Sequence, residues 1–502
     1  MGPVEGLLFG LKVIFEWHNL LAAFAGALVG TAVGVLPGLG PVAGIAIILP
    51  LTYSLSPTAG LIMMAGIFYG AMYGGSTTAI LVNMPGETAS VMTCIDGHQL
   101  TKKGRAGAVL FIVALGSFVG GTLAVVGVML FAPQLAKFGI LFGPAEFFAM
   151  TAGGLLLLTR ISGGSLAAGL LPMALGLLLS TVGQEAVTAQ NRFTFGFNDL
   201  TAGFALVALV VGIYGISEIL AVIDSLERQV KPIPVKLREM LPTRTELQRS
   251  AAPFGRGTVV GFLFGLIPGP SATLASFASY RLEKAVSKHR DEVGRGAIEG
   301  VAGPETANNA AATSSLVPLL ALGIPFAPIT ALMMSALLVH GIQPGPLLVA
   351  QHPEIFWGVI ASMYIGNVIL VILNVPLVSV WVSMLRIPQW IFLPLILMVA
   401  VIGAYSVHNS VLDLYVLCAM GAIGYVLRKF DFQLAPLVVG VVLGPLIEKH
   451  LREGLIMNRG EFSVFYESPI ALSIWGLVVL VLVAGFSRRL FGRLFGGVAR
   501  EA

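Results

Sequence analysis

Two clusters of hydroxyl, amide and carboxyl side chains interrupt long apolar stretches of this chain. They comprise Ser76, Thr77, Thr78 and Asn83 in the first cluster and Glu305, Asn308 and Asn309 in the second. Such groups are costly in a hydrocarbon environment unless they pair with each other or coordinate a solute. Hydroxyls and amides suit a carboxylate, and Glu305 suits either a solute or a cation. Hydrogen bonding between helices is the alternative explanation for both clusters.

A Pro-Gly pair precedes each cluster. The residues concerned are Pro37, Gly38 and the nearby Gly40 before the first cluster, and Pro268 and Gly269 before the second. Proline removes a backbone donor and glycine frees the backbone, so a helix ends there. A helix that ends at membrane depth leaves carbonyl groups that only protein or a water-filled cavity can satisfy. We expect the freed carbonyls to hold a cation, or else to mark a structural break only, and we expect Ser271 to join the second cluster.

The two halves of the chain repeat each other. Both read G-x-x-x-G-x-x-x-G-x-x-P-G, from Gly26 and from Gly257, an offset of 231 positions. Glycines four residues apart let another helix approach closely, so we expect tight packing at the three early glycines. Pro85 and Pro325 differ by 240 positions, which gives the second copy about nine extra residues. Duplicated broken helices are the best pointer in a sequence to the binding site of a transporter.

The composition requires a membrane. Of the 502 residues, 56% are hydrophobic and 11% are charged, and the mean hydropathy is +0.91. Soluble domains carry about 25% charged residues. No Asp, Glu, Lys or Arg occurs from Trp17 to Gly86 or from Thr306 to Pro353. We predict an all-α polytopic membrane protein with about 10–12 transmembrane helices, several of them broken or re-entrant.

We predict four regions along the chain. They are a first transmembrane repeat over 1–223, a cytoplasmic linker over 224–256, a second repeat over 257–487 and a basic cytoplasmic tail over 488–502. Basic residues concentrate in the linker and the tail, and such residues stay on the cytoplasmic side. We expect the two repeats to be inverted, as is common in carriers with broken helices.

The chain resembles the large membrane subunit of the tripartite tricarboxylate transporters. The matching segments, in the order of that family, are Gly34–Gly40, Tyr73–Thr78, Asn83–Glu87, Asp96–Gly97, Arg192–Gly196, Gly265–Gly269, Gly300–Asn309 and Gly341–Pro346. They span about residues 20 to 350, whereas the last 150 residues match mainly in hydropathy. Phe326 departs from the Gly-Ile-Pro-Gly that the family usually has, which argues against assuming citrate as the substrate.

The resemblance implies a secondary transporter of the bacterial inner membrane. It implies two partners, namely a small four-helix membrane subunit and a periplasmic binding protein that delivers a carboxylate. The implied coupling ion is Na⁺, favoured over H⁺, and no other metal or cofactor is expected. No nucleic-acid partner is expected either.

A channel and an intramembrane enzyme are the alternative functions. The chain has no G-x-x-x-x-G-K-[ST], H-E-x-x-H or C-x-x-C motif. An enzyme needs a nucleophile and a base, and neither Ser76 nor Ser271 has a His or Lys obviously placed beside it. Two broken copies in one chain fit a carrier better than a channel.

Several other polar residues receive individual predictions. Glu87 is expected to cap a following helix, and Asp96 is expected in a turn. Arg192 could meet a carboxylate but is expected on a loop. Acids inside apolar spans are candidates for ion sites, and here these are Glu146, Glu218 and Asp413.

Overall fold

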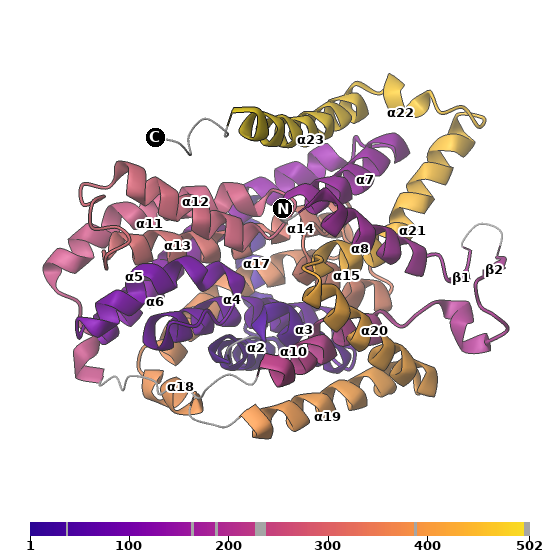
Figure 1. The fold of residues 1–502 in the computed structure, drawn as a ribbon. Coiled ribbons are helices and arrows are strands. Elements are labelled where there is room, and N and C mark those ends of the chain that lie inside the picture. Colours follow the sequence, from indigo (N-terminus) through magenta and orange to yellow (C-terminus); the bar gives the residue numbers. More distant parts are fainter. Residues whose placement is uncertain (37–38, 162–164, 186–188, 226–236, 386–388, 496–502) are drawn as a thin grey trace. The chain divides into compact units, whose positions relative to one another are not determined.

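The structure is a computed structural model that describes all residues except 37–38, 162–164, 186–188, 226–236, 386–388 and 496–502 (Figure 1). About 80% of the chain is helical. The strands of the described part are β1 (Gly183–Gln184) and β2 (Asn191–Arg192), which form a short antiparallel hairpin. The prediction of an all-α protein is confirmed.

The chain forms two compact units, each built from two segments. Unit 1 comprises residues 1–140 and 205–426, and unit 2 comprises residues 141–204 and 427–502. The two units are defined by contacts between residues, whereas the predicted regions are defined by the sequence repeat and the charge pattern. The predicted repeat boundaries therefore stay a prediction.

Unit 1 contains the helices of both polar clusters. Its first segment holds α1 (Pro3–Ile14), α2 (Trp17–Val35), α3 (Gly40–Thr52), α4 (Pro57–Val82), η1 (Thr88–Ser90), α5 (Val91–Lys102) and α6 (Ala106–Gly139). Its second segment begins with α9 (Leu206–Val210), a π-helical turn η3 (Val211–Ile216), α10 (Ser217–Ser225), η4 (Leu237–Met240), α11 (Arg244–Gly265), α12 (Ser271–Val286), α13 (Glu299–Ser314) and α14 (Leu316–Leu322). It continues with α15 (Pro328–Val339), α16 (Leu348–Gln351), α17 (Pro353–Asn374), α18 (Val378–Met384), α19 (Gln389–His408) and α20 (Val411–Lys429).

Unit 2 packs four helices against one another. It contains α7 (Pro144–Ile161), α8 (Leu166–Leu179), η2 (Asn198–Ala202), α21 (Leu434–Met457), α22 (Val464–Glu467) and α23 (Pro469–Phe495). Helix α21 packs on α7 and α8, and α23 packs on α7.

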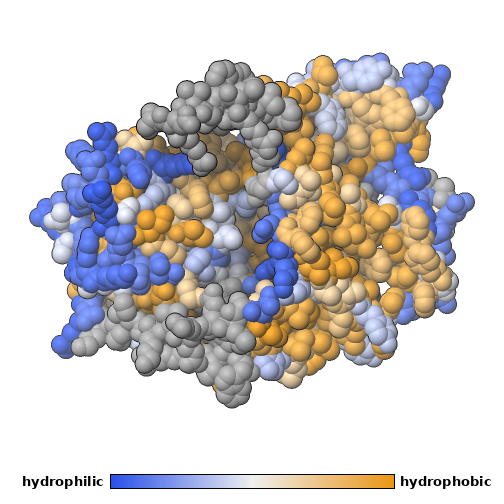
Figure 2. Space-filling model, in the orientation of Figure 1, coloured by the Kyte–Doolittle hydropathy of each residue, from blue (hydrophilic) through white to orange (hydrophobic). Residues whose placement is uncertain are grey.

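Six described helices are long and apolar enough to cross a membrane, and five shorter apolar helices accompany them. Large apolar side chains are exposed on these helices, for example Phe24 on α2 and Leu123 on α6, as expected for helices that face lipid. Figure 2 shows hydrophobic residues in broad patches and hydrophilic residues at the left of the view, over the ends of α5 and α11. The prediction of a polytopic membrane protein is confirmed, and the number of crossings stays a prediction.

The glycine motif packs in the same way in both halves. Helix α2 lies along α4, and α11 lies along α13 (Figure 1). A Cβ added at Gly26, Gly30 or Gly34 would clash with the carbonyl oxygens of Met63, Ile67 and Ala71, respectively. A Cβ added at Gly257, Gly261 or Gly265 would clash with those of Gly303, Ala307 and Ala311, respectively. Each α13 residue follows its α4 counterpart by 240 positions, so the packing role and the extra nine residues of the second copy are both confirmed.

The offset of 240 positions also relates the end of α4 to the end of α14, the helix that follows α13. Asn83 ends α4 in the left-handed conformation at φ 59°, and Gly323 ends α14 at φ 71°. After each end, a hydroxyl accepts a hydrogen bond from a backbone amide three residues earlier: Ser90 from Glu87, and Thr330 from Ala327. The duplication therefore extends through the helix end and into the following turn.

The structure differs from the sequence predictions at one residue and adds detail at two other places. The polar residues Ser76–Thr78 lie within a helix, because α4 continues to Val82. Within the predicted linker, α11 begins at Arg244, where Thr243 and Glu246 form a capping box. Asp96 is not in a turn but lies buried on α5, where it accepts hydrogen bonds from Tyr280 and from the amides of residues 294, 296 and 297.

Candidate functional site

Glu305 lies at the centre of a buried polar network that joins the two halves of unit 1. Its side chain is fully buried on α13. Ser76 of α4 donates to Glu305 Oε2 at 2.5 Å, and Thr93 of α5 donates to Glu305 Oε1. Asn308, one turn further along α13, donates to Oε2 at 3.1 Å. Two donors come from the first half and one from the second, so the carboxyl group links them.

The network continues along α13 to a fourth helix, α6. Asn309 Nδ2 lies 2.7 Å from Asn308 Oδ1 and 2.8 Å from the hydroxyl oxygen of Ser117 on α6. It also lies 3.1 Å from the backbone oxygen of Glu305. Asn308 and Asn309 are both buried. Buried amides with this many partners hold α4, α6 and α13 in one arrangement.

Glu87 is a second buried carboxyl group beside the same turn of α4. Its Oε2 accepts a hydrogen bond of 2.7 Å from the amide of Ala89, which confirms the predicted capping role. Its Cγ would lie 2.9 Å from a Cβ added at Gly75, the residue before Ser76. Its Oε1 is buried without a hydrogen-bond partner among the described residues.

Two tyrosines lie on α4 ahead of Ser76. Tyr69 and Tyr73 are almost fully buried, and neither hydroxyl has a partner in the described part of the chain. Residues three and four apart share a helix face, so Tyr73 neighbours Ser76 and Tyr69 lies one turn further away. Buried hydroxyls without a protein partner are uncommon, so these two are further candidate contacts for a ligand.

The other predicted site residues lie outside this network. Thr78 donates to the carbonyl of Gly75 in its own helix, and Asn83 is exposed at the end of α4. Thr77 is buried, and no side-chain hydrogen bond joins it to the described residues of the network. Ser271 is buried at the first position of α12, where its amide contacts the carbonyl of Gly269 at 2.8 Å.

The second Pro-Gly break is visible between α11 and α12. Gly269 has φ 133°, a conformation that favours glycine, and its amide donates to the carbonyl of Phe326 at 3.0 Å. Pro268 lies between the end of α11 at Gly265 and the start of α12. In the first half, α2 ends at Val35 and α3 begins at Gly40, which has φ 59°. Pro37 and Gly38 lie outside the described residues.

Other charged residues named in the sequence analysis have structural partners. In unit 2, Glu146 accepts a hydrogen bond from the amide of Gly143 at 2.8 Å and another from Ser468. Arg192 of the same unit pairs with Glu448 at 2.9 Å. In unit 1, Asp413 lies 3.1 Å from His408. Glu218 also has an interaction partner.

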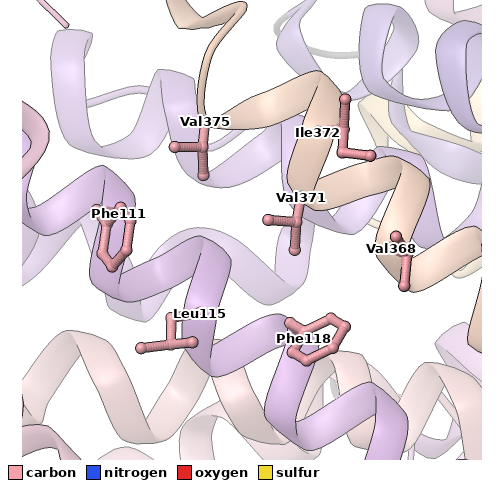
Figure 3. Close-up of a pocket in the computed structure, with 7 residues that line it drawn as sticks. All are labelled: Phe111, Leu115, Phe118, Val368, Val371, Ile372 and Val375. Atoms are coloured by element: carbon pink, nitrogen blue, oxygen red, sulfur yellow. The ribbon is translucent and has the colours of Figure 1, made fainter.

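A pocket of about 280 Å³ lies between α6 and α17 (Figure 3). Its lining consists of Phe111, Leu115, Phe118, Val368, Val371, Ile372 and Val375. All seven side chains are hydrocarbon, so this pocket offers no donor to a carboxylate and no oxygen to a cation. The Glu305 network is therefore the better candidate for the functional site.

Comparison with known proteins identifies the family of the chain. Residues 20–439 match the model of the tripartite tricarboxylate transporter TctA family. This chain belongs to that family. An uncharacterised 52.8 kDa protein from the TAR-I ttuC' 3' region of Agrobacterium vitis is 46% identical over 485 residues, which cover 96% of each chain.

A second relative is an uncharacterised protein from the TAR-II ttuC' 3' region of Agrobacterium vitis. It is 52% identical over 225 residues, which cover 45% of this chain and 93% of that protein. No solved structure matches the chain. Membership of the TctA family makes the chain a membrane component of a tripartite tricarboxylate transporter, and its partners are the other components of such a system.

Thr93 and Ser117 of the network, and the tyrosines Tyr69 and Tyr73 beside it, were not predicted from the sequence. Thr93 and Ser117 are isolated hydroxyl residues in helices, and the two tyrosines look like ordinary aromatic residues in an apolar stretch. The available signal was the spacing from Tyr69 and Tyr73 to Ser76, seven and three positions, which places all three on one side of α4. Thr93 and Ser117 become visible only when the packing of α5 and α6 is known.

Proposed function

We propose that this TctA-family chain carries a small carboxylate across the bacterial inner membrane, with uptake driven by a coupled cation. The observation that supports this most is the buried contact of Ser76 and Thr93 with Glu305. It places hydroxyls of one half beside a carboxyl group and amides of the other half. Such sites between repeats are where secondary transporters bind their solutes.

The substrate carboxylate would use the hydroxyl and amide groups around this network. From the first half we propose Ser76, Thr77, Thr78 and Asn83, and from the second half Ser271, Asn308 and Asn309. Ser76 and Asn308 already donate hydrogen bonds to Glu305. Substrate binding to these two residues therefore requires that the bonds to Glu305 are shared or released. The cation would use Glu305 and the backbone carbonyls of the two breaks, at Pro37, Gly38 and Gly40 and at Pro268 and Gly269.

We further propose a periplasmic binding protein that delivers the solute and a small four-helix membrane subunit that completes the carrier. The substrate would be a tricarboxylate or a related organic acid. Phe326 adds bulk beside the second break, where its carbonyl contacts Gly269, and therefore no single acid is assigned. In an alternating-access cycle, the core that contains both Pro-Gly breaks would move relative to the remaining helices.

Uptake of labelled di- and tricarboxylates by cells that express the chain with both partners tests this proposal. We expect uptake that needs the binding protein and either a Na⁺ or a proton gradient. Ser76→Ala and Asn308→Ala should each weaken the apparent affinity about 10-fold, the usual loss for a hydrogen bond to a charged group. Ser362→Ala is the control, because this buried hydroxyl bonds only within α17.

Absence of uptake for every acid tested, with the protein well expressed, would remove the proposed substrate class. Unchanged affinity in both Ser76→Ala and Asn308→Ala would keep the carrier function but contradict the placement of the site.

A further inference from the structure

Two buried carboxyl groups flank one turn of α4. Glu305 accepts a hydrogen bond from Ser76, and Glu87 lies against Gly75, the preceding residue. Glu305 is fully buried and Glu87 is 8% exposed. The two acids come from different halves of the chain and from segments 218 positions apart.

Neither carboxyl group has a basic partner. Within the described residues, no Lys, Arg or His nitrogen lies within 4.0 Å of either group. Two other buried acids of unit 1 differ in this respect: Glu283 pairs with Arg256 at 2.6 Å and Glu299 pairs with Arg249 at 2.8 Å. The fold therefore supplies arginines of α11 to the buried acids on α12 and at the start of α13, but not to this pair.

Two buried oxygen atoms at this pair have no hydrogen-bond partner among the described residues. Glu87 Oε1 is buried without a partner among the described residues, and so is the hydroxyl of Tyr73, on the face of α4 that carries Ser76. Glu305 has three donors, which are all neutral groups and leave its charge uncompensated. Buried charge without compensation is costly, so such a group takes up a proton or a cation.

We infer that Glu87 and Glu305 together bind one small monovalent cation, Na⁺ or H⁺, and that this binding makes the adjacent carboxylate site usable. The inference rests on the proposed function, which it deepens by naming the groups that compensate charge. A substrate carboxylate beside two buried acids would add a further negative charge. The cation offsets that repulsion, and by linkage the carboxylate strengthens cation binding by the same factor.

The helices that carry or pack against this pair hold other titratable groups. They are Tyr69 and Tyr73 on α4, Cys94, Asp96, His98 and Lys102 on α5, Tyr280, Arg281, Glu283 and Lys284 on α12, and Glu299 on α13. Lys102, Arg281 and Lys284 are exposed. Asp96 bonds to Tyr280 and to backbone amides, Glu283 pairs with Arg256, and His98 contacts the carbonyl of Ile80 at 3.2 Å. A cation-dependent change at this site is therefore assigned to the two acids.

Cation binding to the purified full chain, without any carboxylate, tests the inference independently of transport. ²²Na⁺ binding is measured at fixed pH for the wild type, Glu87→Gln, Glu305→Gln and the control Glu354→Gln, whose side chain is 45% exposed. In parallel, infrared difference spectra between high and low pH, without Na⁺, detect protonation of a buried carboxyl group. Thr93→Val removes one oxygen beside Glu305 and gives a variant that keeps both acids.

If Na⁺ is the ligand, ²²Na⁺ binding is lost in Glu87→Gln and Glu305→Gln, weakened in Thr93→Val and kept in Glu354→Gln. If H⁺ is the ligand, ²²Na⁺ does not bind, and the protonated carboxyl band disappears in the two glutamine variants only. Once a transported acid is known, its affinity should rise about 5–150-fold with the cation in the wild type and much less in Glu305→Gln.

The inference is overturned if folded wild-type protein shows neither signal, or if both signals persist in Glu87→Gln and Glu305→Gln. A positive cation result with no carboxylate uptake would instead count against the proposed function alone. Uptake that depends on the cation equally in wild type and both glutamine variants would leave the carrier proposal standing and remove this one.

Discussion

Single carboxyl groups in unit 1 follow two different designs. Asp96 is buried and accepts hydrogen bonds from one hydroxyl and three backbone amides, so its charge is spread over fixed donors. Among the described residues, Glu305 receives hydrogen bonds from hydroxyl and amide side chains only, and Glu87 Oε1 has no partner. The first design suits a permanent structural anion, and the second suits a group whose charge changes during function.

Asp96→Asn tests the structural design. An asparagine keeps one acceptor oxygen and places an amino group against the amides of Gly294, Gly296 or Ala297, so we expect a loss of about 1–3 kcal/mol. Hydrogen–deuterium exchange should become faster at these amides. The exposed Asp291→Asn in the same loop is the control and should change little. Unchanged protection in Asp96→Asn would contradict the anchoring role.

The pairing of Ser76, Glu305, Asn308 and Asn309 could be anticipated from the sequence, because polar groups in apolar stretches need a partner. The place of Asp96 could not, since the neighbouring glycine and basic loop resemble a turn, whereas the amides that bind it lie about 200 positions away. Thr93 could not be predicted for the same reason. Partners that are remote in sequence become apparent only from the packing of the helices.

At the scale of elements, the glycine motif determines which helices touch. Glycines at intervals of four bring α2 onto α4 and α11 onto α13, with the backbone carbonyls of one helix against the bare Cα atoms of the other. A separate contact, between α4 and α13, places Ser76 within hydrogen-bond distance of Glu305. The repeat, its offset and its packing role could be predicted from the spacing alone, whereas the extent of α4 to Val82 could not. The two glycines and three hydroxyl residues at 74–78 have low helix propensity, but burial among other helices overrides that local preference.

Gly261→Ala and Gly255→Ala make a matched pair on α11. A methyl group at 261 would clash with the carbonyl of Ala307, whereas one at 255 meets no atom within 4 Å. We expect Gly261→Ala to destabilise the protein by about 1–3 kcal/mol through overpacking. Gly255→Ala should be neutral or should stabilise the helix by up to about 1 kcal/mol. Thermal unfolding in detergent measures both, and equal melting temperatures would show that α11 and α13 do not pack closely.

At the scale of the molecule, the two halves of unit 1 are joined by several independent contacts. Glu305 bonds to Ser76 and Thr93, and the hydroxyl oxygens of Thr88 on η1 and Thr273 on α12 are 2.8 Å apart. These contacts agree with a core in which both breaks move together. If the halves instead separated during transport, every one of these contacts would have to break in each cycle.

A disulfide between positions 88 and 273 distinguishes these two motions. The short distance between the two hydroxyls suits a disulfide in Thr88→Cys/Thr273→Cys, made in a background with Cys94→Ser and Cys418→Ser. We expect the oxidised protein to keep its uptake, because the link lies within the proposed moving core. Each single-cysteine variant, treated with the same oxidant, is the control. Loss of uptake on oxidation, with recovery on reduction, would mean that the two halves move against each other, and the contacts of Glu305 would then break and re-form during transport.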